Sequence, residues 1–304
     1  MTRVITLLFL ITALLPAAPG EPFYRLSFSE RSRIFFTGDH SGNEEIYLVT
    51  EGRLRNLTNH PASDRWPTVD PSGLRLLFTS NRSGNYDLYT LDLRNGRLDR
   101  LTFDPADELS PIWSPDGRAV LFDLQKENGL FVTYRLDLSS RHREPLFPGA
   151  PYPSTIVPFP SSRSGEIFFT GKVLLGWKVA KYDPLRKRYV DLGERGSCRP
   201  RLSPDGKRIA YVSHRDDGLG DIFSMNTDGS QKTNLTPSRS RFYDYYPSFS
   251  PDGKRIVFSS SSEGKGKGSY QLYLLDLATR KVRRIFFSSG NNSFPFWAPP
   301  LPQP

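Results

Sequence analysis

The chain has 304 residues, of which 24 are Gly, 26 are Pro and 13% are aromatic. This content of turn-forming residues argues against a helical bundle or a coiled coil, and the aromatic content argues against intrinsic disorder. A single Cys excludes an internal disulfide framework and a Cys-based zinc site, whereas the net charge of +9 suggests an anionic partner only if the basic residues are clustered.

The first 20 residues have the pattern of a secretory signal. Arg3 precedes an apolar run from Val4 to Leu15, and small residues follow as far as Gly20, after which we expect cleavage. A membrane anchor is the alternative, but about 12 apolar residues are too few for a span of about 20. The sequence therefore predicts an exported protein, periplasmic or secreted, with a mature chain that begins at residue 21.

A five-residue motif recurs through the rest of the chain. It has Pro at both ends and an apolar third residue, and it occurs at 67–71, 111–115, 200–204, 247–251 and 295–299. Successive copies begin 44, 89, 47 and 48 residues apart. Because 89 is close to two periods, we place a degenerate copy at 158–160, which gives six repeats of about 47 residues.

Each repeat contains the same order of predicted strands and turns. In the second repeat the motif ends in a turn at 71–73, an apolar strand follows at 76–78, and a polar loop at 81–85 leads to an alternating strand at 87–92. A hairpin turn with Gly and a last strand ending in Leu-Thr complete the repeat. Four antiparallel strands per repeat are typical of a β-propeller blade, which must stack on its neighbours to bury both faces.

The two ends of the chain can close the ring. Residues 33–37 have the pattern of a second strand, and the missing first-strand motif of that blade appears at 295–297. We therefore predict an all-β, six-bladed propeller over residues 21–304, in which a C-terminal strand completes the first blade. Phe28-Ser29 is the alternative first strand.

The repeats resemble the TolB-type β-propeller repeat, a variant of WD-like repeats. The resemblance rests on residues 249–256 and their copies and on residues 78–89, and it extends over residues 23–299. The fourth repeat departs most, because Ser161–Gly165 stands where Pro-Asp-Gly is expected. TolB also carries a separate α/β domain before its propeller, whereas few residues lie here between the predicted signal and the first blade. The resemblance implies the fold and does not carry over the Tol–Pal role.

Polar residues stand three positions before the Pro of each repeat. The first strand of a blade lies closest to the central channel, so we expect these residues at the rim of one mouth, where they could bind a partner or a cation. They are Asp64, Glu108, Thr155, Ser197, Asp244 and Asn292. The alternative is that each satisfies backbone groups of its own turn. Apart from such a cation we predict no cofactor.

Three histidines are secondary candidates for a metal site. His40, His60 and His214 fall on loops of the same face as this mouth, and with nearby carboxylates they could ligate a transition metal, as in propeller enzymes that act on acidic sugars. Neither His40 nor His214 occupies an inner-rim position, and no G-x-S-x-G motif occurs. We therefore predict no catalytic residue, and retain a metal-assisted lyase or hydrolase of acidic polysaccharide as the alternative function.

Two apolar segments on the same face are candidates for binding a protein or peptide. Residues 173–177 are apolar where other repeats have polar loops, and residues 242–246 form an aromatic cluster before a first strand. The candidate anchors are Leu175, Trp177, Phe242, Tyr243, Tyr245 and Tyr246. Trp and Tyr are common interface anchors, although they also fill the gaps between blades. The sequence therefore predicts a monomeric, non-catalytic scaffold for a partner in the periplasm or cell envelope.

The basic excess lies in the last blades. Residues 1–180 contain 20 basic and 20 acidic residues, whereas residues 181–304 contain 21 basic and 12 acidic, a net of +9. The runs 186–188 and 280–284 fall on hairpins predicted to face away from the candidate mouth. Export makes nucleic acid an unexpected partner, so we expect these hairpins to meet an anionic surface or glycan.

Overall fold

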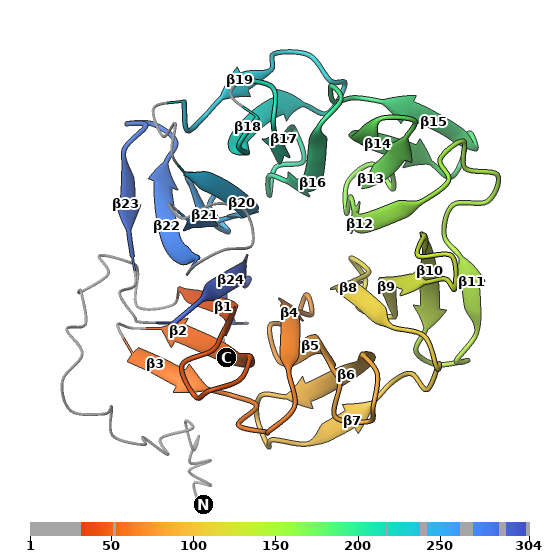
Figure 1. The fold of residues 1–304 in the computed structure, drawn as a ribbon, viewed down its shortest axis with the longest axis vertical. Helices are drawn as coiled ribbons and strands as arrows, with labels where there is room; N and C mark the ends of the chain where they lie inside the picture. Colours follow the sequence, from red (N-terminus) through yellow and green to blue (C-terminus); the bar gives the residue numbers. More distant parts are fainter. Residues whose placement is uncertain are drawn as a thin grey trace, which may run out of the picture.

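The computed structural model describes residues 32–50, 53–216, 218–237, 242–261, 270–285 and 290–301. They form six four-stranded antiparallel sheets arranged as a ring around a central axis (Figure 1). The predicted all-β, six-bladed propeller is therefore confirmed. In the part of the chain described, no helix is long and apolar enough to cross a membrane. The predicted signal, residues 1–20, and the alternative strand Phe28-Ser29 lie outside the described residues.

The blades are numbered here in chain order, and the strands of each are given from the axis outward. Blade 1 contains β24 (Asn292–Trp297), β1 (Arg33–Gly38), β2 (Glu45–Thr50) and β3 (Arg53–Asn56). Blade 2 contains β4 (Asp64–Val69), β5 (Arg75–Ser80), β6 (Asp87–Asp92) and β7 (Leu98–Arg100). Blade 3 contains β8 (Glu108–Trp113), β9 (Ala119–Gln125), β10 (Phe131–Asp137) and β11 (Arg143–Pro145).

The second half of the ring has the same arrangement. Blade 4 contains β12 (Thr155–Pro160), β13 (Ile167–Val173), β14 (Gly176–Asp183) and β15 (Arg188–Asp191). Blade 5 contains β16 (Ser197–Leu202), β17 (Arg208–Ser213), β18 (Asp221–Asn226) and β19 (Thr233–Asn234). Blade 6 contains β20 (Tyr243–Phe249), β21 (Arg255–Ser261), β22 (Gln271–Asp276) and β23 (Val282–Arg284).

The second strand of each blade is the most buried. Five of the six residues of β5 and all six residues of β1 are buried, because both faces of such a strand meet a neighbouring blade. A strand buried on both faces needs a continuous apolar run rather than alternation, which explains runs such as Leu76-Leu77-Phe78. The core is therefore a set of layers between successive blades.

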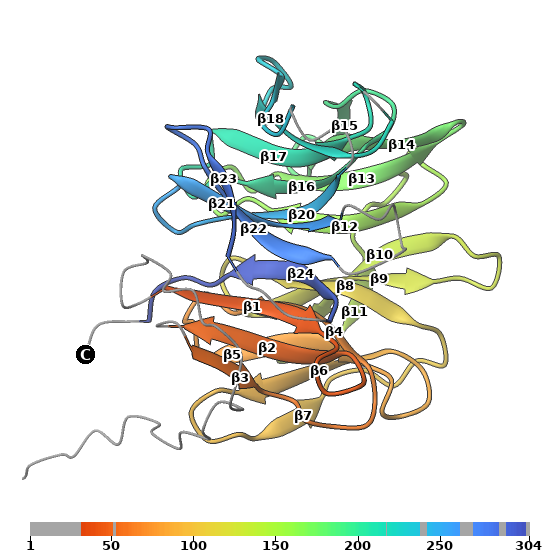
Figure 2. The ribbon, with the colours of Figure 1, turned by 60° about the vertical axis from the view of Figure 1, so that its left-hand side comes forward.

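The ring closes as predicted, through β24. This strand pairs antiparallel with β1, with Ile34 opposite Trp297 and Gly38 opposite Asn292, and Figure 2 shows the two strands side by side. Ile34 and Trp297 share an apolar cluster with Val257 and Leu274 of blade 6. The last strand thus joins the two ends of the chain and also seals the contact between blades 6 and 1.

Every inner strand has a β-bulge at the same place. Its pairing with the second strand shifts register in all six blades, and the residue directly before the repeat Pro has a φ of 52–57°. These residues are Trp66, Ser110, Val157, Arg199, Tyr246 and Phe294. A positive φ costs a residue other than Gly roughly 1–2 kcal/mol, so the surrounding structure must hold each one.

Several bulges are held by the preceding blade. The backbone N–H of Trp66 donates to Thr37 Oγ1 at 3.3 Å, and that of Arg199 donates to Thr170 Oγ1 at 2.9 Å. The N–H of Val157 likewise donates to a carboxylate oxygen of Asp123 at 2.8 Å. A donor left free by the bulge therefore bonds between blades, which satisfies it away from water.

Two apolar segments differ locally from the expectation. Residues 243–246 belong to β20 instead of the loop before it, because Tyr243 pairs with Ser261 and Tyr245 with Ser259. The aromatic residues 243–246 therefore belong to the inner strand of blade 6.

Residues 173–177 are a hairpin rather than a loop, since Val173 pairs with Gly176 and leaves only two residues in the turn.

Candidate functional site

The six polar residues predicted at the channel mouth lie at or near the start of the inner strands. Five of them begin β4, β8, β12, β16 and β24, and Asp244 is the second residue of β20. Their exposed fractions are 0% for Asp64, Glu108, Ser197, Asp244 and Asn292 and 4% for Thr155. The structure therefore brings them to one level of the ring but buries their side chains, and their role in binding stays a prediction.

Most of these side chains bond to their own or the preceding blade. The Asp64 carboxylate accepts two hydrogen bonds from Arg82, at 2.9 and 3.0 Å. The Ser197 hydroxyl donates to the Glu194 carbonyl at 2.6 Å. Asp244 accepts a 2.5 Å hydrogen bond from the Ser260 hydroxyl. Of these three contacts only that of Ser197 is to a backbone group, as the alternative interpretation expected, whereas Asp64 and Asp244 bond to side chains of their own blades.

Glu108 lies in a different environment. Its closest cation is Arg143, whose Nη1 lies 3.6 Å from a carboxylate oxygen. Burial raises the pKa of Glu108 to about 8, and the nearby carboxylates of Asp87 and Asp104 act in the same direction. The carboxyl group therefore holds its proton near neutral pH, because a buried carboxylate is expensive without close compensation.

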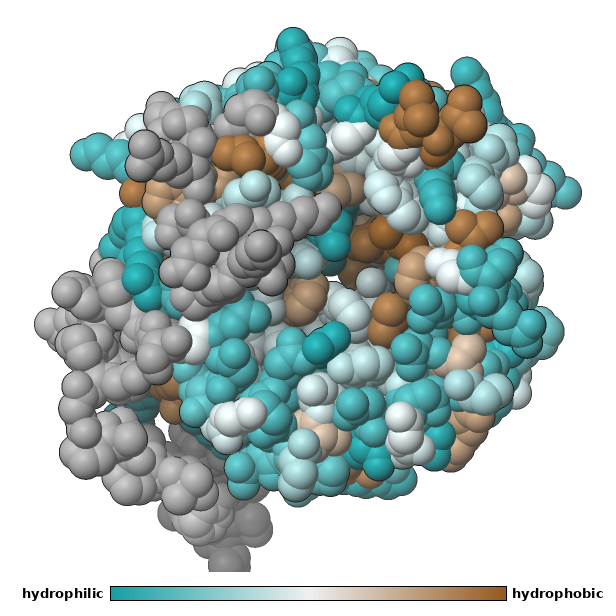
Figure 3. Space-filling view, in the orientation of Figure 1, coloured by the Kyte–Doolittle hydropathy of each residue, from teal (hydrophilic) through white to brown (hydrophobic). Residues whose placement is uncertain are grey.

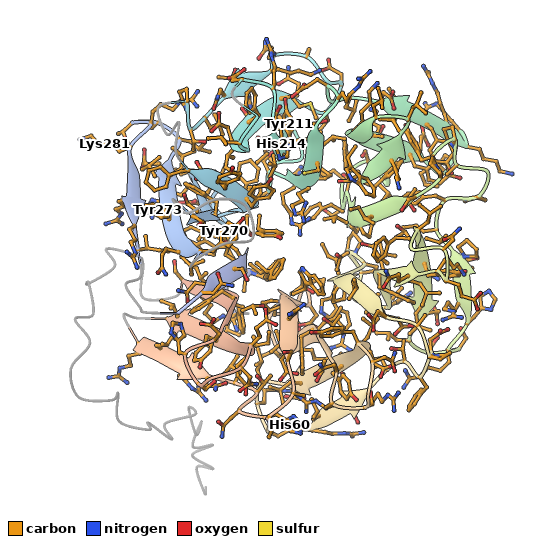
Figure 4. All side chains as sticks on the ribbon, viewed as in Figure 1. His60, Tyr211, His214, Tyr270, Tyr273 and Lys281 are labelled. Carbon is orange, nitrogen blue, oxygen red and sulfur yellow. The ribbon has the colours of Figure 1, made fainter. Side chains whose placement is uncertain are left out.

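The three candidate metal-binding histidines do not converge. His40 Nε2 lies 2.8 Å from Asn292 Oδ1, and His60 Nδ1 accepts from the Ala62 N–H at 3.1 Å. His214 lies 2.7 Å from the Gly196 carbonyl and 2.6 Å from the Tyr245 hydroxyl. Figure 4 shows His60 and His214 on opposite sides of the ring. Within the residues described, no three His, Cys, Asp or Glu side chains group in a way that could hold a metal.

The apolar candidates of blade 4 are exposed at the tip of the β13–β14 hairpin. Leu174 is 97% exposed and Leu175 is 65% exposed, and Trp177 beside them is half-buried. Figure 3 shows hydrophobic surface (brown) over this hairpin at the upper right, and again beside the central opening. Consecutive exposed leucines next to a Trp are unusual on a surface that meets only water.

The aromatic candidates of blade 6 differ in burial. Phe242, Tyr243 and Tyr246 are half-buried, whereas Tyr245 is only 3% exposed. Tyr245 packs against Tyr246 and Tyr270, with ring centroids 5.8 and 6.4 Å apart. Among the described residues no ring contact joins this cluster to Trp177. The two predicted apolar segments are therefore separate, on blades 4 and 6, with blade 5 between them.

A further set of residues lies on the inner wall of the ring and was not selected from the sequence as a candidate site. They are the six bulge residues, and neighbouring ones touch across blades: the ring of Phe294 lies 4.3 Å from that of Tyr246 and 5.0 Å from that of Trp66. The signal was available, since each stands directly before the repeat Pro. The bulge, which strand alternation does not predict, is what turns this position toward the axis.

The basic runs lie where they were predicted. Arg186, Lys187 and Arg188 are exposed around the β14–β15 hairpin, and Arg280 and Lys281 are exposed before β23. Lys281 is labelled at the outer edge of blade 6 in Figure 4. In an antiparallel blade these hairpins open on the face opposite the β13–β14 tip, so basic and apolar surfaces are separated.

A cleft also opens on that opposite face. It lies between blades 5 and 6, has a volume of about 530 Å³ and includes Asp205, Asp252 and Arg208 in its wall. Both carboxylates bond to the Ser hydroxyls of their own turns, Ser203 and Ser250, at 2.5 Å. Its wall contains none of the predicted binding residues.

The chain is similar to known propeller proteins. In sequence it is 30% identical over 171 residues to dipeptidyl-peptidase 5 of Porphyromonas gingivalis, a match that covers 54% of this chain and 23% of that protein. In structure it is similar to TolB from Acinetobacter baumannii, with a TM-score of 0.76 and 21% identity over 89% of this chain and 68% of that one. A putative TolB from Agrobacterium tumefaciens superposes with a TM-score of 0.69 and 21% identity, covering 86% and 91% of the two chains.

The family match follows the repeats. The model of the TolB beta propeller domain matches residues 26–154 and 176–300. The unmatched stretch contains the degenerate motif at 158–160 and the atypical turn at Ser161–Gly165, so the departure expected in the fourth repeat is confirmed. Because the match covers most of the chain and the described residues build all six blades, the chain belongs to the TolB beta-propeller domain family.

Proposed function

We propose that this chain is an exported, non-catalytic propeller scaffold that binds a protein or peptide partner in the periplasm or cell envelope. The observation that carries the proposal is the exposed Leu174-Leu175 tip beside Trp177. The corresponding segments of other blades are polar, such as Asn81–Asn85 in blade 2. A partner that covers the tip removes apolar surface from water, which favours association.

Two further features support the proposed export of the chain and the proposed orientation of its two faces relative to an anionic surface. The signal-like pattern of residues 1–20 supports export, and the single, buried Cys198 is compatible with an oxidising compartment. The exposed basic hairpins lie on the face opposite the apolar tip. Attraction of that face to anionic lipid headgroups or glycan would leave the apolar tip directed away from the surface, free for the partner.

Capture of a partner tests this proposal. Two variants, Trp177→Ala/Tyr243→Ala and Leu174→Ser/Leu175→Ser, are expected to lower the recovery of a specific partner from an envelope extract at least tenfold, because they remove the apolar anchors. Recovery is measured by affinity capture and quantitative mass spectrometry, and circular dichroism and thermal melting check that each variant is folded.

The control is Leu185→Ser. Leu185 is 88% exposed on the β14–β15 hairpin, so the change matches the others in chemistry but lies on the opposite face. It is expected to leave capture unchanged. Equal recovery with the wild type and with both folded anchor variants would contradict partner binding at this tip.

A further inference from the structure

Two arginines of blade 5 lie on the channel wall. Arg199 and Arg201 flank Pro200 in the inner strand β16, and both are partly exposed. The Arg199 guanidinium lies over the ring of Tyr246 in blade 6, at 4.6 Å, and the Arg201 guanidinium lies over Phe159 in blade 4, at 5.2 Å. Each guanidinium therefore packs against a ring on the inner strand of an adjacent blade.

Neither guanidinium has a carboxylate partner among the described residues within 4.0 Å. Arg199 donates to the Tyr246 hydroxyl at 3.4 Å and approaches Cys198 Sγ at 3.5 Å, and its Nε is buried without an acceptor. Arg201 donates to the carbonyl of Pro200 at 3.0 Å. Several other partly buried arginines pair with a carboxylate, such as Arg82 with Asp64, whereas Arg33 and Arg208 donate to carbonyl or hydroxyl oxygens. What distinguishes Arg199 and Arg201 is that both lie on the same inner strand, against aromatic rings of the neighbouring blades.

The carboxyl group of Asp123 offsets only part of the positive charge of Arg199 and Arg201. Asp123 acts on Arg201, but its carboxylate already accepts hydrogen bonds from the Val157 N–H at 2.8 Å and the Thr133 hydroxyl at 2.9 Å. Burial raises the pKa of Asp123 to about 7, so its negative charge is incomplete near neutral pH. Burial, followed by the charge of Arg199, lowers the pKa of Arg201 to about 10. The two like charges, two residues apart, are thus only partly compensated on this wall.

The wall beside Arg199 is aromatic. Tyr246, Phe294 and Trp66 follow one another around the axis from blade 6 to blade 2, with ring centroids 4.3 and 5.0 Å apart. The bulge holds Arg199 at a φ of 57° and fixes its N–H on Thr170. The guanidinium is therefore presented by a constrained backbone and a stacked ring, which reduces the entropy lost when it binds an anion.

We propose that Arg199 and Arg201 form a carboxylate-binding site in the channel, in which Tyr246, Phe294 and Trp66 contact the apolar group next to that carboxylate. The planar fork of a guanidinium matches a carboxylate in a bidentate hydrogen-bonded pair. The inference deepens the proposed function and rests on it for the source of the ligand: the partner presents a segment with an aromatic or apolar residue next to a carboxylate.

The site is tested with a small probe and without any partner. Phenylacetate is titrated into the full mature chain by isothermal calorimetry or by NMR, with phenylacetamide as the neutral isostere and inorganic phosphate as a non-planar anion. We expect phenylacetate to bind at least tenfold more tightly than either. Arg199→Gln/Arg201→Gln is expected to weaken its affinity at least tenfold, and Arg201→Lys, which keeps the charge but not the fork, is expected to give an intermediate loss.

The control is Arg186→Gln/Arg188→Gln. It removes the same two charges from an exposed hairpin on the other face and is expected to leave phenylacetate affinity within twofold of the wild type. Equal weakening in both double variants, equal affinity for phenylacetamide, or tighter binding of phosphate would overturn the carboxylate site. If the double Gln variant does not fold, Arg199→Gln alone and Arg201→Lys carry the same comparison.

The two proposals fail separately. Phenylacetate binding that depends on the arginines, without partner capture by the β13–β14 tip, would leave the channel site standing and remove the docking proposal. The reverse outcome has two parts: the folded Arg199→Gln/Arg201→Gln protein still captures the partner, and the wild type does not bind phenylacetate. That result would remove the channel site and leave the docking proposal standing.

Discussion

Replacement of Trp297 by Ala is expected to lower the free energy of unfolding by about 3–5 kcal/mol. Trp297 is 5% exposed and packs with Ile34 of blade 1 and Val257 and Leu274 of blade 6. Its backbone N–H also donates to Ser248 Oγ in blade 6 at 3.0 Å. The cavity would therefore open at the one place where the last strand of the chain closes the ring.

Trp66→Ala provides the matched control for this change. Trp66 is also on an inner strand, but it is half-buried on the channel wall and contacts chiefly other partly exposed rings. The same substitution there is expected to cost about 1–2 kcal/mol, because less apolar surface is lost from the core. Urea denaturation followed by circular dichroism measures both. Equal costs for the two variants would mean that Trp297 has no special role in closure.

Glu108→Gln is expected to stabilise the protein at alkaline pH. The pKa of Glu108 is about 8 in the folded protein against an ordinary value of 4.5. Between these values the folded state holds a proton that the unfolded state has lost, so the contribution of Glu108 to stability is fully present below pH 4.5 and is lost as pH rises through 8. Gln keeps the shape of the neutral carboxyl group but does not ionise.

The advantage of the Gln variant is therefore expected to grow with pH. It should reach roughly 3–5 kcal/mol at about pH 9 and be within about 1 kcal/mol at about pH 4. Urea denaturation across this range measures it. Glu144→Gln, on an exposed side chain of the same blade, is expected to change stability by less than about 0.5 kcal/mol. An advantage that does not depend on pH would contradict the assignment to Glu108.

The repeats could be predicted from the sequence because each blade of a propeller is specified by residues close together in the chain. The period of the Pro-containing motif, the Gly turns and the apolar second strands depend on residues close together in the chain, and each blade repeats them. Closure was readable too, because the missing first strand of blade 1 left an unmatched motif at 295–297. Even the weakest repeat, around 158–165, was identified by its departure from the others.

The candidate site was less readable, because it depends on bulges and on neighbouring blades. Counting positions from the repeat Pro correctly identified a common level of the ring, but it selected Asp64 and its equivalents, whose side chains are buried. The residue two positions later carries the positive φ and lines the channel wall. A period of two cannot show this, since the bulge adds a residue to one strand and changes the direction of those that follow.

The sequence by itself determined the number of blades, the order of their strands, the way the ring closes and the separation of the basic hairpins from the apolar tip. Each follows from local turn chemistry and hydrophobic pattern, which act over a few residues. Only the tertiary structure decided which polar groups are buried and which arginines lack a carboxylate. Arg199 meets Tyr246 and Arg201 meets Phe159 across blade boundaries, so their surroundings come from residues about 40 to 50 positions away that only stacking brings together.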